Sequence, residues 1–186
     1  MSVNLHDFLK NSYADKKKQM EGLKRNGYNY DSMLSNHNQQ VYYNPNDKKL
    51  LVSVAGTHNL KDWGTDAYLA LGKLKDTSRY KEANQIFKEA KRKYNPKKTT
   101  VTGNSLGGSI AGYIAGKNDK VVTHNKGATI GQKMRANETH FRTNGDVVSL
   151  LNAKSKHTVN LKNPNLFKDP YHAHLVGTLK NSKIKI

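Results

Sequence analysis

The chain contains no cysteine, few acidic residues and no long apolar run. The lack of cysteine excludes a disulfide framework, a thiolate metal site and a cysteine nucleophile, so any catalytic nucleophile must be an oxygen. Residues 1–18 lack the uninterrupted apolar stretch of a secretory signal, and the longest apolar run, LLVSVAG from residue 50, is too short to span a bilayer. We therefore expect the protein to be soluble as made.

The apolar fraction is also low, at 35% of the 186 residues. A chain of this length can still bury about two thirds of the surface that its unfolded form exposes, but its core must be concentrated in a few segments. There is no internal repeat, low-complexity tract or convincing linker. These features predict a single domain over residues 1–186.

Acidic residues are outnumbered by basic ones, with 14 Asp and Glu against 32 Lys and Arg and a formal net charge of +18. Such a charge attracts anionic surfaces, so anionic lipid and nucleic acid are both candidate partners. The alternative is that the basic clusters are simply solvated faces. The abundance of Lys and Asn fits an AT-rich genome, such as that of a large DNA virus, and we expect a cytoplasmic or virion-associated protein. The clusters include Lys16 to Lys18, Lys91 to Lys93, Lys97 with Lys98, Lys154 with Lys156, and Lys180 to Lys185.

Hydrophobic periodicity predicts that strands alternate with helices. A helix, either continuous or broken, is expected over residues 3–25, and a second over residues 78–94 with Thr77 or Ser78 as its cap. Alternation of this kind favours a mainly parallel sheet with helices on its faces, in which ligands bind at the carboxyl ends of the strands. Strands are predicted at residues 50–55, 99–102, 120–123, 139–142 and 157–161, and a helix of small residues at 105–115.

The strongest chemical signal is the sequence GNSLG at residues 103–107, which lies between a β-branched run and an Ala- and Gly-rich helix. A serine at such a strand-to-helix turn projects its hydroxyl above the sheet, and the glycines tolerate the crowding. The amide of Leu106 lies at the helix N-terminus, where it can stabilise an oxyanion. The pattern favours Ser105 as the nucleophile of acyl transfer, although a non-catalytic turn or an anion-binding turn is the alternative.

A nucleophilic serine needs a base, and the base needs an acid that orients it. In hydrolases that carry the serine at such a strand-to-helix turn, the chain order is serine, acid, histidine. Asp146 lies in a turn after a predicted strand, and His172 and His174 follow near the end of the chain. Only one of these histidines can be the base. The alternatives are an ordinary turn aspartate and a surface histidine pair, or a metal site with Asp169.

Taken together, these motifs make the chain resemble the class 3 lipase family, the α/β-hydrolases related to fungal triglyceride lipases. The family motif GHSLGG reads GNSLGG at residues 103–108, with Asn104 in the place of histidine. The family's R-G-[ST] turn, which follows a strand and precedes a tryptophan, is matched by Ala55, Gly56 and Thr57, with Trp63 downstream. The resemblance covers roughly residues 40–178 and implies a compact α/β-hydrolase fold.

The resemblance also implies roles for individual residues. Thr57 would supply the second oxyanion-hole amide, and residues 58–71 would take the place of the lid. Asp146, within a motif like N-x-x-D-x-V that is one residue shorter here, would be the acid. His174 fits the family's histidine position better than His172, although the serine that commonly follows it is absent.

The sequence thus predicts a lipase or phospholipase with a Ser105, Asp146 and His174 triad that needs no metal or organic cofactor. Its high positive charge favours phospholipids and mixed membrane glycerides over neutral oil as substrates, since each Lys or Arg near an anionic bilayer contributes about 1 kcal/mol. Two alternatives stay open. One is a catalytically silent hydrolase-fold protein that binds nucleic acid or serves as a virion component. The other is a peptidase or general esterase on the same fold.

Overall fold

A computed structural model of the chain describes residues 2–57, 72–127, 132–163 and 173–186. Its centre is a seven-stranded sheet in which the strands follow one another in sequence order, β1 to β7. Strands β3 to β7 are parallel to one another, while β1 and β2 are antiparallel to their neighbours. The strands are β1 Asn29–Tyr30, β2 Gln39–Asn44, β3 Lys49–Val54, β4 Lys98–Asn104, β5 Lys120–His124, β6 Glu138–Thr143 and β7 Thr158–Leu161. The expected mainly parallel sheet is confirmed.

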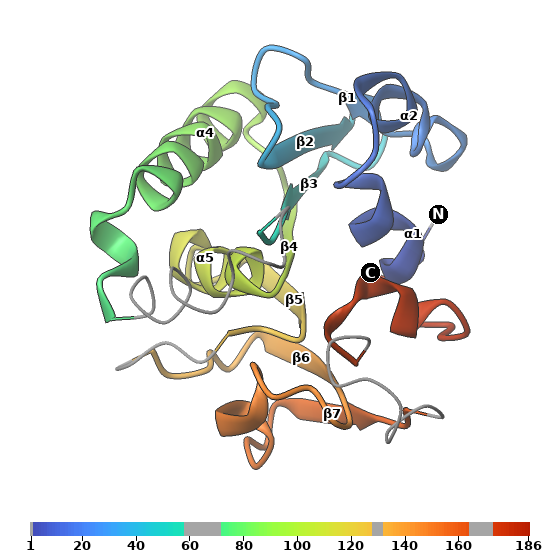
Figure 1. Cartoon of the computed structure of the whole chain (residues 1–186). Coiled ribbons are helices and arrows are strands. Elements are labelled where there is room, and N and C mark those ends of the chain that lie inside the picture. Colours follow the sequence, from blue (N-terminus) through green and yellow to red (C-terminus); the bar gives the residue numbers. More distant parts are fainter. Residues whose placement is uncertain (1, 58–71, 128–131, 164–172) are drawn as a thin grey trace.

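Helices cover both faces of this sheet (Figure 1). One face carries α4 (Ser78–Tyr94) and α5 (Leu106–Ile114), and the other carries α1 (Leu5–Asn11) and the 3-10 turn η5 (Val176–Leu179). The remaining elements are α2 (Lys16–Glu21) and the 3-10 turns η1 (Lys24–Asn26), η3 (Leu74–Asp76) and η4 (Leu150–Asn152). Within the described chain, no helix has the length and apolar character needed to cross a membrane.

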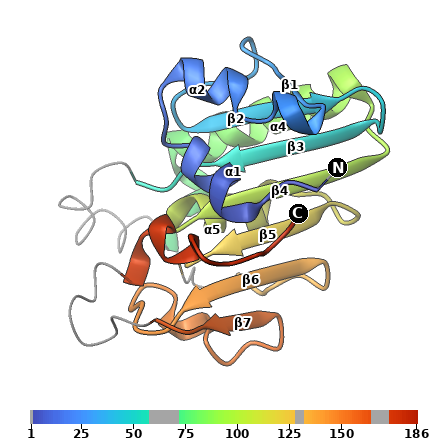
Figure 2. The ribbon, with the colours of Figure 1, turned by 90° about the vertical axis from the view of Figure 1, so that its right-hand side faces the viewer.

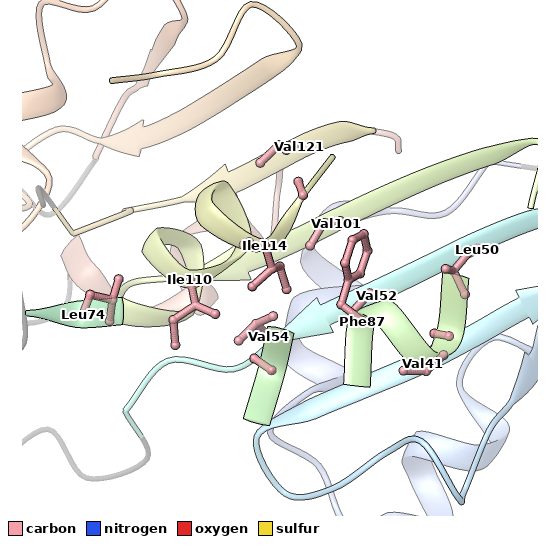
Figure 3. Close-up of a cluster of buried hydrophobic side chains, with 14 residues drawn as sticks. Val41, Leu50, Val52, Val54, Leu74, Phe87, Val101, Ile110, Ile114 and Val121 are labelled. Carbon is pink, nitrogen blue, oxygen red and sulfur yellow. The ribbon is translucent and has the colours of Figure 1, made fainter. Parts of the chain in front are cut away.

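Alternate residues of the central strands pack into separate apolar layers, as the period of a strand requires. The larger layer, between the sheet and the pair α4 and α5, contains Leu50 and Val52 of β3 together with Phe87 and Ile110 (Figure 3). On the opposite face, Leu51 of β3 packs in a cluster with Phe8 of α1. The sheet therefore has buried faces on both sides, which explains the strongly apolar run of β3.

The predicted elements agree closely with the observed ones, with two instructive differences. Helix α4 has the expected bounds, and the hydroxyl of Thr77 caps it by accepting a hydrogen bond from the Tyr80 amide at 3.2 Å. The predicted N-terminal helix is indeed broken, since α1 ends at Asn11 and α2 begins at Lys16. Strand β2 was not predicted, since its sequence QQVYYN is largely polar and yet almost fully buried.

Candidate active site

Three chain segments that the sequence singled out meet at the carboxyl ends of the parallel strands, which is the left-hand edge of the sheet in Figure 2. They are the turn after β3, the turn after β4 and the loop after β6. Segment 173–175, which precedes η5, lies beside them because the Asn125 side chain donates a hydrogen bond to the carbonyl of Ala173 at 2.8 Å. The edge therefore gathers Thr57, Ser105, Asp146 and His174 from four separate parts of the chain.

Ser105 lies between β4 and α5 with a backbone φ of 54° and ψ of −127°. A non-glycine residue rarely adopts a positive φ, and such strain is concentrated at functional sites. The Ser105 side chain is buried, and its Oγ makes no hydrogen bond to any described residue. The turn thus holds, at the start of a helix, a hydroxyl that has no hydrogen-bond partner among the described residues.

The glycines around Ser105 are required by close packing. A Cβ on Gly103 would lie 2.3 Å from the carbonyl oxygen of Gly107, and a Cβ on Gly107 would lie 2.2 Å from that of Val54. Both distances are far below van der Waals contact, so only glycine lets α5 start so close to β3 and β4. The amide of Leu106, the first residue of α5, lies where a helix offers no carbonyl partner, and it can bind an anion.

The turn that contains Thr57 packs directly against Ser105. A Cβ on Gly56 would lie 3.1 Å from the Cβ of Ser105. Two side chains fix this turn: the Gly56 amide donates to the hydroxyl of Tyr13 at 2.7 Å, and the Arg79 guanidinium donates to the Ala55 carbonyl at 2.8 Å. Thr57 therefore lies on a turn that is held in place next to Ser105. The family motif has an arginine at the position of Ala55, whereas in this chain the arginine that binds the turn is Arg79 of α4.

Asp146 and His174 form a buried pair, with 2.7 Å between Oδ1 of Asp146 and Nδ1 of His174. The Asp146 carboxylate also accepts hydrogen bonds from the amide and the hydroxyl of Ser149. Burial by itself would raise the pKa of Asp146, but the hydrogen bonds from His174 and Ser149 outweigh it, so the pKa lies below its usual value. An ionised Asp146 accepts from Nδ1–H, which leaves Nε2 as the His174 nitrogen that can take up a proton.

A second buried histidine, His124 at the end of β5, links the parts of the site. Its Nδ1 donates to Oδ1 of Asn104 at 2.8 Å, and its Nε2 accepts from the hydroxyl of Thr143 at 3.1 Å. The side-chain NH2 group of Asn104 in turn donates to the hydroxyl of Tyr13 at 3.4 Å. Burial lowers the pKa of His124 to about 3, so this ring stays neutral near pH 7 and acts as a fixed hydrogen-bonding bridge.

Asn125 is a further positioning residue. Besides binding the Ala173 carbonyl, its side-chain oxygen accepts the Thr143 amide at 2.8 Å, and its backbone has a φ of 43°. It therefore ties the loop of Asp146 to the segment of His174. Sequence analysis missed Tyr13, Arg79, His124 and Asn125; only the last two carried a signal, because they lie at the carboxyl end of a predicted strand.

Two predictions concern residues that lie outside the described ranges. His172, the other candidate base, and the candidate lid at residues 58–71 both lie there. Among the described residues, no three His, Asp or Glu side chains cluster so as to hold a metal ion.

Comparisons with known proteins identify the family and the fold of the chain. A family model described as phospholipase-like, a Tle-like phospholipase domain, matches residues 10–160. No curated protein matched the chain.

Solved structures share the fold at low sequence identity. A triacylglycerol lipase with a serine protease triad has a TM-score of 0.55 at 12% identity, covering 81% of this chain and 76% of its own. The N225Q mutant of MDLA from Penicillium cyclopium has a TM-score of 0.53 at 13% identity, with coverages of 78% and 71%. Lip2 lipase from Yarrowia lipolytica has a TM-score of 0.50 at 12% identity, with coverages of 80% and 75%. The chain therefore has the α/β-hydrolase fold of the fungal lipases.

Proposed function

The chain belongs to the family of Tle-like phospholipase domains, and we propose that it hydrolyses lipid esters with Ser105 as the nucleophile. The observation that carries the proposal is the strained, buried Ser105 turn, with its uncommitted Oγ, at the sheet edge that also holds the Asp146–His174 pair. A nucleophile, a histidine base and an acid that orients it are the groups that acyl transfer requires, and the proposal assigns these roles to Ser105, His174 and Asp146.

In the first half of the reaction, His174 removes the proton from Ser105 as the hydroxyl attacks the ester carbonyl. Asp146 stays ionised, holds the imidazole by Nδ1 and stabilises the imidazolium that forms. The amides of Leu106 and Thr57 bind the oxyanion of the tetrahedral intermediate. The proton held by His174 then passes to the leaving alcohol, and an acyl-enzyme remains.

In the second half, His174 activates a water molecule that attacks the acyl group, and the collapse of this intermediate releases the fatty acid and restores Ser105. The rigid turn around Gly56 supports this step as well, because the same two amides receive the second oxyanion. A preorganised oxyanion hole commonly contributes about 3 to 4 kcal/mol per donor.

We propose phospholipid as the substrate class, drawing on the family and on the charge of the chain. A net charge of +18 concentrates the protein at anionic bilayers. Lys73 and Lys75 are exposed just before α4, which starts at the same sheet edge as Ser105. In this proposal these lysines meet headgroup phosphates while Ser105 attacks the acyl ester.

The test compares the wild-type protein with Ser105→Ala on a short fatty-acyl nitrophenyl ester and on phosphatidylcholine vesicles that contain phosphatidylserine. Ser78→Ala, an exposed serine at the start of α4, is the matched control. We expect hydrolysis of both substrates by the wild type and the control and about 10⁴-fold or greater loss in Ser105→Ala. Ester turnover without vesicle turnover would favour the general esterase or peptidase. No turnover by the wild type would favour the catalytically silent, nucleic-acid-binding or virion-associated protein.

A further inference from the structure

The edge of the sheet opposite Ser105 is strongly basic. Strands β3 to β7 all begin there (Figure 2). Exposed lysines occupy the loops or first residues that lead into four of these strands. We name this set the amino-end lysine row. It consists of Lys48 before β3, Lys97 and Lys98 at β4, Lys117 and Lys120 at β5, and Lys154 and Lys156 before β7.

The positive charge of this row is largely uncompensated among the described residues. None of its lysines forms an ion pair with a residue in the described ranges, whereas the nearby carboxylates are already paired. Asp47 binds Lys49 at 2.8 Å, and the buried Asp119 binds Lys91 at 2.7 Å. Exposed charges without a structural partner cost little to remove, so the row has no evident role in stabilising the fold.

The row extends along the edge from β3 to β7, with a gap at β6, whose first residue is the buried Glu138. The amide of Lys97 donates to the carbonyl of Lys48 at 2.8 Å, so the first two loops touch. Neighbouring strands are about 4.8 Å apart, and the distance from β3 to β7 along the edge is therefore about 20 Å. A line of positive charges of this length matches a phosphodiester backbone, which carries one charge per about 3.4 Å of each strand.

The position of the row argues against a membrane as its occupant. Lys98 starts β4 and Ser105 follows its other end, so the two are about 20 Å apart along the strand. A bilayer held by this edge would keep its esters away from the proposed catalytic serine. This step rests on the proposed function, but the binding test below does not.

We propose that the amino-end lysine row is a docking surface for the phosphate backbone of a nucleic acid. Lysines act there as point charges that contact phosphates and read no base sequence. Binding is therefore sequence-independent and falls steeply with salt, and it leaves the opposite edge of the sheet open to substrate.

The experiment measures binding of a labelled 20-base-pair DNA duplex by fluorescence anisotropy between 50 and 200 mM salt. The test variant replaces Lys97, Lys98, Lys117 and Lys120 with Gln. The matched control removes the same charge elsewhere, through Lys10→Gln, Lys16→Gln, Lys17→Gln and Lys180→Gln, all of which are exposed. Each lost phosphate contact lowers the slope of log K against log salt by about 0.9.

We expect the wild type and the control to bind with similar salt slopes and the test variant to lose about 3 to 4 units of slope. Over that salt range the affinity of the wild type would then fall about 100-fold more than that of the test variant. Hydrolysis of a soluble ester should be equal in all three proteins. Equal losses in test variant and control, or no DNA binding by the wild type, would overturn the proposal. So would a test variant that keeps DNA binding but no longer binds phosphatidylserine vesicles.

Discussion

The imidazole of His174 and the carboxylate of Asp146 are hydrogen-bonded at 2.7 Å and buried, although 28 residues separate them in sequence. The pair is held from both sides: Ser149 donates to the carboxylate, and Asn125 anchors the segment that carries the histidine. If Asp146 acted only through its negative charge, the two loops that carry Asp146 and His174 would not both need to be held by hydrogen bonds. The arrangement instead fixes which nitrogen of His174 carries the proton.

The first prediction concerns Asp146→Asn. The amide has the shape of the carboxylate, but it cannot hold the Nδ1–H tautomer of His174 in the same way, so we expect kcat on a soluble ester to fall about 10⁴-fold. Asp47→Asn, at the opposite edge, is the control and should keep wild-type kcat. A fall of less than tenfold in a folded Asp146→Asn protein would contradict the role of this acid.

The second prediction concerns Tyr13→Phe. The change removes the acceptor of the Gly56 amide and leaves a donor unsatisfied in a mostly buried place, which costs about 1–3 kcal/mol of unfolding free energy. Because Gly56 precedes the proposed oxyanion amide of Thr57, we expect kcat to fall about tenfold while KM changes little. Tyr43→Phe, on β2, is the control. Steady-state kinetics and urea unfolding decide the matter: a loss of stability with unchanged kcat would show that Tyr13 only supports the fold.

The third prediction concerns the glycines. Gly107→Ala places a Cβ 2.2 Å from the Val54 carbonyl oxygen, so β3 and α5 must separate. We expect a loss of about 3 kcal/mol or more in unfolding free energy, together with loss of activity. In Gly177→Ala the new Cβ meets nothing within 4 Å, and the protein should keep its stability to within about 1 kcal/mol. Chemical denaturation of both variants tests the contrast, and similar stabilities would refute it.

The fourth prediction concerns acid stability. Burial would raise the pKa of Asp31, but hydrogen bonds from Lys93 at 2.6 Å and Tyr94 at 2.7 Å outweigh it and hold the pKa below its usual value. A carboxyl whose pKa is lower in the folded state stabilises the protein above the unfolded pKa of about 3.9, and this contribution is lost as the pH falls through the folded pKa.

Asp31→Asn should therefore lower the unfolding free energy at pH 7 by about 1–3 kcal/mol, since it weakens charged hydrogen bonds at a buried site. Its stability should also change less than that of the wild type between pH 5 and pH 2.5. Urea unfolding across this pH range measures both effects. Parallel stability curves for the two proteins would show that Asp31 does not titrate with folding.

Much of the fold could be predicted because its signals are local. The stripe of α4, its Thr77 cap and the β-branched runs of β3, β4 and β5 depend on residues close together in sequence. The strand β2 could not be predicted in this way. The side-chain NH2 group of its buried Gln39 donates a hydrogen bond to the carbonyl of Ala83, which lies 44 residues away, and no pattern within the strand indicates that partner.

The sequence by itself determined the turn around Ser105, because a serine between glycines at a strand-to-helix junction is a local feature. Through chain order it also proposed Asp146 as the acid and either His172 or His174 as the base, and the family resemblance favoured His174. Only the tertiary structure decided that the side chains of Asp146 and His174 meet, that Tyr13 and Arg79 hold the turn beside Ser105, and that His124 bridges Asn104 and Thr143. The physical reason is that such contacts join residues far apart in sequence, and the packing of the whole sheet selects them.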